Sequence, residues 1–139
     1  MIGNMKFTGC WKNGIYYYLL AQGVGGILWW CLLFLRPHYR SWFLAETLPE
    51  RVLISFWLPD CLIFITGSMA AAYGYRNRRS WFPPVLYFLT GGISYVSLYC
   101  LTLSFSTHGG WPGTLVMLFC MLVMLLICLV LNSDQHREI

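Results

Sequence analysis

Four stretches of the chain are almost entirely apolar, and most polar residues lie between them or at the chain ends. Each stretch has 18 to 24 residues, and a helix needs about 20 apolar residues to cross a bilayer. The pattern therefore predicts an all-α integral membrane protein. The expected transmembrane helices cover residues 15–35, 52–75, 84–105 and 114–131.

The connections between these stretches are short. The first, residues 36–51, has 16 residues, and the last contains the turn-forming pairs Gly109-Gly110 and Pro112-Gly113. Helices joined by short connections usually pack side by side in opposite directions. We therefore expect one domain, residues 1–139, that folds as an up-down four-helix bundle.

The composition agrees with a chain whose surface faces lipid. Hydrophobic residues make up 58% and charged residues 10%, whereas a soluble domain has about 25% charged residues. The basic residues form no continuous stripe, so we expect no binding to nucleic acid. The six cysteines include no CxxC pair, and we expect them to act as small apolar residues.

The basic residues also indicate an orientation. With four spans, both chain ends and the second connection share one side of the membrane. That side holds Lys6, Lys12, Arg76, Arg78, Arg79 and Arg137, and the other side holds Arg36, Arg40 and Arg51. Because the side with more Lys and Arg usually stays inside, we expect both termini to be cytoplasmic, in the inner or plasma membrane of the cell.

One acidic residue lies inside an apolar stretch. Asp60 follows Pro59 in "SFWLPDCLIF" (residues 55–64), eight residues after Val52 at the start of its stretch, which is about 12 Å along a helix. An ionised aspartate in the middle of a span costs about 2.5–3.5 kcal/mol. The carboxyl group should therefore be paired, hydrated or protonated. Pro59 removes one backbone hydrogen bond and predicts a kink.

Depth and helix periodicity select partners for this aspartate. We predict that Asp60 hydrogen-bonds to Tyr95 or Tyr99 of the third span and is covered by Trp29 of the first, with Gln22 in the same polar core. Two interpretations stay open. The contacts can hold helices together, at about 0.6 kcal/mol each, or they can form a proton or ligand site, since acids inside a membrane are commonly functional.

The first connection contains a cationic and aromatic segment. Arg36, His38 and Arg40 can bind lipid phosphates, or the segment can anchor the chain at the membrane surface. His, Cys, Asp and Glu lack any standard metal-ligand spacing, and no catalytic or cofactor motif is found, so we expect no metal and no cofactor. The fourth span lacks a polar stripe and is expected to face lipid or a second copy of the chain.

Three segments show a family resemblance. "AQGVGGILWWCLLFLRPHYRSWF", "SFWLPDCLIFITGSMAAAYG" and "SYVSLYCLTLSFSTHGGWPGTLVM" are rich in aromatic residues, and the second contains "WLPD". Together they resemble the N-terminal multi-span region of bacterial proteins related to isoprenylcysteine carboxyl methyltransferases, over most of residues 20–122. The catalytic part of that family is typified by an Arg-His-Pro-x-Tyr segment that helps to bind S-adenosylmethionine. Here "RPHYR", residues 36–40, has those letters in another order and lies between the first two spans. The resemblance implies a membrane module without the methyltransferase half.

Three functions are compatible with this pattern. The first is a non-enzymatic membrane module that binds lipid or a partner membrane protein, with Asp60 in its polar core. The second is a small proton-coupled transporter, expected to be a dimer, with Asp60 as the proton carrier. The third is a lipid-modifying enzyme related to the methyltransferases.

Overall fold

The structure, a computed structural model, describes residues 9–45 and 47–135. These residues form helices and turns and contain no strand. Four helical segments are long and apolar enough to cross a membrane: Asn13–Leu35, Glu50–Arg76, Phe82–Thr107 and Trp111–Ser133. The predictions of an all-helical chain and of four long apolar helices are confirmed.

Three of these segments belong to single continuous helices. They are α1 (Gly9–Leu35), α5 (Phe82–Thr107) and α6 (Trp111–Gln135). Prolines in the first turn of α5 are tolerated because backbone N–H groups there have no helical partner. The helix ends at His108, whose left-handed backbone (φ 54°) stops the helical turn.

The second apolar segment is irregular. It consists of α2 (Glu50–Ser55), α3 (Trp57–Pro59), the π-helical turn η2 (Asp60–Ile65) and α4 (Thr66–Arg76). In η2 the hydrogen-bonding pattern widens by one residue, so that the backbone N–H of Thr66 bonds to the carbonyl of Cys61. The sequence predicted a kink at Pro59, and the structure has a π-turn that begins directly after this proline. Such turns often occur at functional sites.

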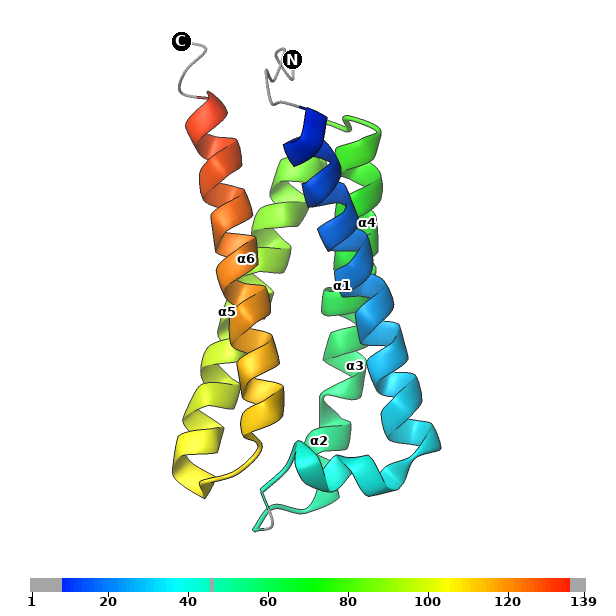
Figure 1. Cartoon of the computed structure of the whole chain (residues 1–139), viewed down its shortest axis with the longest axis vertical. Helices are drawn as coiled ribbons and strands as arrows, with labels where there is room; N and C mark the ends of the chain where they lie inside the picture. Colours follow the sequence, from blue (N-terminus) through cyan, green and yellow to red (C-terminus); the bar gives the residue numbers. More distant parts are fainter. Residues whose placement is uncertain (1–8, 46, 136–139) are drawn as a thin grey trace.

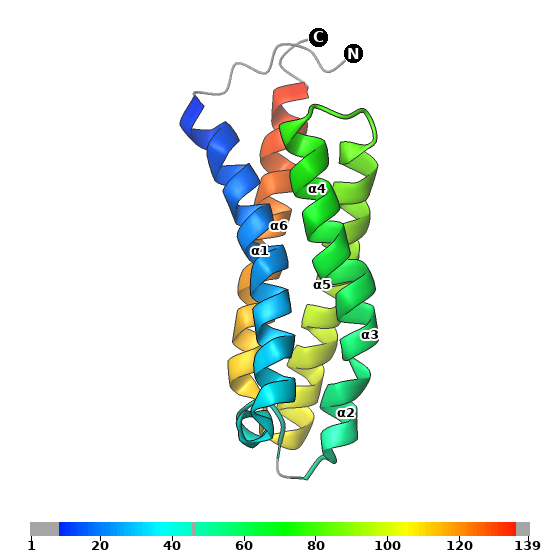
Figure 2. The ribbon, with the colours of Figure 1, turned by 90° about the vertical axis from the view of Figure 1, so that its right-hand side faces the viewer.

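The helical segments lie side by side along the long axis of the molecule (Figures 1 and 2). The start of α1, the 77–81 connection and the end of α6 lie at one end, and the 36–45 and 108–110 connections lie at the other. Helix α1 packs on α4 and η2, α4 packs on α5, and α5 packs on α6. The first connection contains a short 3-10 helix, η1 (Pro37–Trp42).

The tightest packing lies in the half of the molecule that contains the start of α1 and the end of α6. Leu19 of α1, Ala71 of α4, Leu89 of α5 and Met124 of α6 are all completely buried in one cluster. The Tyr18 hydroxyl adds a link by donating to a backbone carbonyl of α6. The four helical segments are therefore joined firmly in this half.

Helix α6 packs more closely on α5 than its sequence suggested. The Ser97 hydroxyl of α5 donates to the Met117 carbonyl at 2.9 Å, and the hydroxyls of Ser104 and Thr114 lie 2.6 Å apart. Thr114 is 2% exposed. One face of this helix packs on α5, and many of its other apolar side chains are exposed, so the expectation that it faces lipid or a second copy stays a prediction. Small hydroxyl side chains bond to backbone and side-chain oxygens there, and a hydropathy pattern does not register such contacts.

Candidate functional site

A cavity of about 530 Å³ lies in the other half of the molecule, between the four helical segments. This volume is within the usual range for small-molecule sites, about 300–1,000 Å³. Most of the lining is apolar, and all four segments and the first connection contribute to it. The aromatic members of the lining include Trp29, Trp30, Phe43, Phe56, Phe64 and Phe119.

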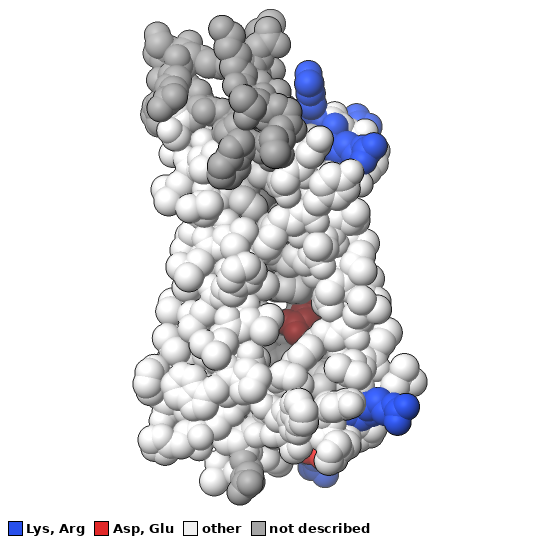
Figure 3. All heavy atoms as spheres, viewed as in Figure 1, with Lys and Arg blue, Asp and Glu red and all other residues white. Residues whose placement is uncertain are grey.

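The cavity is reached from the side of the molecule. On the face shown in Figure 3, a hollow at about mid-height contains an acidic side chain, and the basic side chains lie toward the two ends. Asp60 is the acidic residue that lines the cavity. The hollow lies between α1 and α6 (Figures 1 and 3), which are held together mainly in the opposite half.

The first connection closes one end of the cavity. The ring of Phe43 packs against Trp29 with a centroid distance of 4.1 Å, and both residues line the cavity. Gly109 allows the last connection to lie directly on this segment, because a Cβ atom at position 109 would come within 2.6 Å of the Cα atom of Ala45. The two connections thus form a packed floor.

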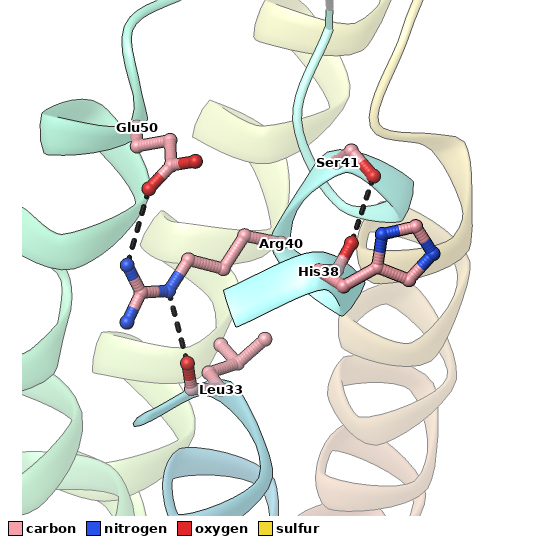
Figure 4. A network of polar contacts seen from close by, with 5 residues as sticks. All are labelled: Leu33, His38, Arg40, Ser41 and Glu50. Carbon is pink, nitrogen blue, oxygen red and sulfur yellow. Dashed lines mark hydrogen bonds and ion pairs between the residues drawn. The ribbon is translucent and has the colours of Figure 1, made fainter. Parts of the chain in front are cut away.

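Arg40 fixes this floor to the helices (Figure 4). Its Nε donates to the Leu33 carbonyl at 2.9 Å, and its Nη1 lies 3.1 Å from the Glu50 carboxylate. The Arg40 side chain is only 14% exposed. Of the three residues predicted to bind lipid headgroups, Arg36 and His38 are exposed, while Arg40 joins the end of α1 to the start of α2.

Asp60 accepts a hydrogen bond from the first helix. The indole Nε1 of Trp30 donates to Oδ2 of Asp60 at 3.1 Å, and Trp30 is 5% exposed. The donor is the residue next to the predicted Trp29. Asp60 begins η2, so the π-turn and the preceding proline determine where its carboxyl group lies.

The predicted contact of Asp60 with the tyrosines of the third span is not formed. Tyr95 is 72% exposed on α5, and Tyr99 packs on Phe56 with ring centroids 5.7 Å apart. The physical reason is the rotation of α5, which directs Ser97 toward α6 and leaves both tyrosines on exposed positions. Val96 and Cys100 of α5 line the cavity instead.

Gln22 is the second polar side chain that the sequence singled out correctly as internal. It is 7% exposed and lines the cavity. Its Nε2 donates to the Ser68 hydroxyl at 3.0 Å, and that hydroxyl donates to the Phe64 carbonyl. Since the Ser68 proton is already used, the Gln22 amide must be the donor. Its Oε1 has no partner among the described residues.

Sequence reasoning missed Trp30 and Ser68. The sequence contains a signal for each of them. Trp30 is an indole N–H donor next to Trp29, and Ser68 is a hydroxyl in the same span as Asp60. Neighbouring residues of a helix point about 100° apart, so only the relative rotation of α1 and η2 decides between the two tryptophans. The parts of the chain that the structure describes contain no group of three His, Cys, Asp or Glu side chains suited to a metal ion.

The fold and the cavity define the class of this protein: a small all-helical chain with four helices apolar enough to cross a membrane and a cavity between them. Comparison with protein-family models, with curated proteins and with solved structures finds no match. The resemblance to the membrane region of methyltransferase-related proteins therefore stays a prediction.

Proposed function

We propose that this chain is an integral membrane protein that binds a lipid or lipid-like molecule in the cavity between its helices. The four helical segments cross the bilayer in alternating directions. The observation that carries the proposal is the cavity itself, which is mainly apolar and has its opening at the side of the molecule.

The outer surface supports insertion in a bilayer. Large apolar side chains are exposed along the helices, among them Leu28 (64%), Phe88 (68%) and Leu129 (67%). Soluble monomers rarely expose large continuous apolar patches. In a membrane the same side chains contact acyl chains. The greater number of basic residues on the side of Arg76, Arg78 and Arg79 supports the orientation with cytoplasmic chain ends.

The depth of the opening supports a ligand that arrives through lipid. Asp60 follows Val52, the start of its apolar stretch, by eight residues, which is about 12 Å along a helix and well inside a hydrocarbon core about 30 Å thick. A side opening at this depth is reached by acyl chains. The packed floor of Phe43 and Ala45 separates the cavity from the nearer membrane surface.

We predict that filling the cavity removes the bound lipid. Val96→Trp on α5 places a large ring in the cavity, whereas Leu98→Trp, on the same helix, changes a side chain that is 54% exposed and does not line the cavity. Native mass spectrometry of protein released from lipid nanodiscs should show one retained amphipathic molecule per wild-type chain, at least five-fold less for Val96→Trp, and no change for Leu98→Trp.

Equal retention by all three proteins would contradict the proposal, because lipid bound only to the outer surface does not depend on position 96. Size-exclusion chromatography and thermal unfolding must show that the Val96→Trp protein remains folded. If it does not, the smaller change Val96→Leu provides the same comparison with less added volume.

A second candidate function is proton-coupled transport with Asp60 as the proton carrier. It is favoured by the position of Asp60 on a π-turn at the edge of a cavity, where only Trp30 is described as a hydrogen-bond donor to it. Transport predicts that Asp60→Asn preserves folding and abolishes pH-dependent flux in proteoliposomes. A purely structural role of Asp60 predicts lower stability for Asp60→Ala and no flux in either form.

A further inference from the structure

We infer that the molecule bound in the cavity is a lipophilic amine, with its ammonium head group on the Asp60 carboxylate and its aliphatic tail along the apolar lining. This inference rests on the proposed function, because it names the ligand class of the same cavity. Three independent features support it: the charge at this depth, the use of the available donors, and the aromatic lining.

The first feature is a carboxylate without a basic partner. None of the four apolar stretches contains Lys, Arg or His. Among the described residues the ion pair is that of Arg40 with Glu50, which lies in the floor. An acid inside a membrane requires a partner charge, a proton or water. A cationic ligand supplies the partner charge that the helices lack.

The second feature is that the lining offers acceptors while its hydroxyl donors are used. The hydroxyls of Tyr18, Thr107 and Thr114 bond to protein oxygens. The Asp60 carboxylate receives one described side-chain donor, from Trp30 at Oδ2, and no hydrogen bond to its Oδ1 is described. A head group with N–H donors fits the Asp60 carboxylate, and a primary ammonium brings three.

The third feature is the ring of aromatic side chains near the carboxylate. Trp29, Trp30, Phe56 and Phe64 all line the cavity together with Asp60. A cation is attracted by the faces of such rings, most strongly when water is excluded. The Asp60 carboxylate repels an anion, so a fatty acid carboxylate is disfavoured.

Binding of three amphipaths with the same chain length tests this inference. Dodecylamine, dodecanol and dodecanoic acid are titrated into the protein in nanodiscs of neutral phosphatidylcholine, with protein-free nanodiscs as the background. We expect dodecylamine to bind at least ten-fold more tightly than either of the other two. Asp60→Asn keeps an acceptor for Trp30 but loses the charge, and it should lower the affinity for dodecylamine to that for dodecanol.

Asp60→Glu is the matched control, since it keeps a carboxylate at the same position on the cavity lining. It should retain the preference for the amine. Equal binding of all three compounds to the wild-type protein would overturn the amine inference and leave the lipid-binding proposal standing. If none of the three compounds binds, both the amine inference and the lipid-binding proposal are overturned. A preference for the amine that survives in Asp60→Asn would overturn the inference, because it would then come from another site.

Discussion

At the scale of single residues, the site depends on one hydrogen bond between two helices. Trp30 is buried and donates to Asp60, which also borders the cavity. The indole therefore stabilises one carboxylate oxygen and orients the side chain. The hydrogen bond joins two helices, which is one of the two interpretations that the sequence left open; the proposed function adds the other, ligand binding by the same residue.

We predict that Trp30→Phe destabilises the protein by about 1–3 kcal/mol, because it leaves a buried acceptor without its donor. Phenylalanine keeps an aromatic ring at this buried position but is smaller than the indole, so part of the loss comes from packing. Trp57→Phe is the control: Trp57 is 43% exposed, and the change should alter the free energy of unfolding by less than about 0.5 kcal/mol. Chemical unfolding in mixed micelles measures the free energy of unfolding of both variants. Equal decreases for the two would show that the Trp30 hydrogen bond contributes nothing to stability.

The sequence identified Asp60 and Gln22 as internal polar residues but assigned the wrong partners to Asp60. A polar residue in an apolar span is visible without a structure, since its cost inside lipid is large. Its partner depends on how neighbouring helices are rotated about their axes. Tyr95 and Tyr99 matched Asp60 in depth, yet the hydrogen bond of Ser97 to α6 turns α5 so that they are exposed.

At the scale of elements, glycines control how closely α1 approaches the second span. A Cβ atom at Gly26 would lie 2.8 Å from Ile65 and 3.2 Å from the Phe64 ring, whereas one at Gly25 would meet nothing within 4 Å. Of the three glycines in "GVGG" (residues 23–26), Gly26 lies directly against η2 and Gly23 against Met69 of α4, whereas Gly25 has open space beside it at the edge of the cavity. Small residues permit this contact between helices in a membrane.

The two neighbouring glycines provide a matched pair. Gly26→Val should destabilise the protein by about 1–3 kcal/mol through overpacking against η2, and Gly25→Val should be neutral or slightly stabilising because a helix interior disfavours glycine. Thermal unfolding in detergent compares them. A loss of the same size at both positions would indicate a general effect on α1 instead of a contact with η2.

Element boundaries were predictable where the hydrophobic pattern is continuous, as in α1, α5 and α6. The division of the second span into α2, α3, η2 and α4 could not be predicted, because Pro59 is the one signal of irregularity in that part of the sequence. In the π-turn, the backbone after this proline forms hydrogen bonds between residues five apart. It depends on packing against α1 as well as on the local residues.

At the scale of the whole molecule, the four segments meet closely in one half and separate around a cavity in the other (Figure 1). The number of long apolar helices follows from the sequence, since each apolar stretch is long enough for a bilayer. The presence of the cavity does not follow from the sequence, because it results from the way the α1–η2 pair and the α5–α6 pair separate toward the packed floor. The proposed function requires that this cavity is open to lipid.

Photocrosslinking from inside the cavity tests that claim most directly. A benzophenone amino acid replaces Val96, which lines the cavity, and is activated in the membrane before extraction. The same residue at Leu98 (54% exposed) and at Leu89 (0% exposed) gives the lipid-facing and fully buried references. We predict that mass spectrometry finds a lipid adduct at position 96, as at position 98. If position 96 forms only crosslinks within the protein, as position 89 should, the cavity is closed to lipid and the proposed function is wrong.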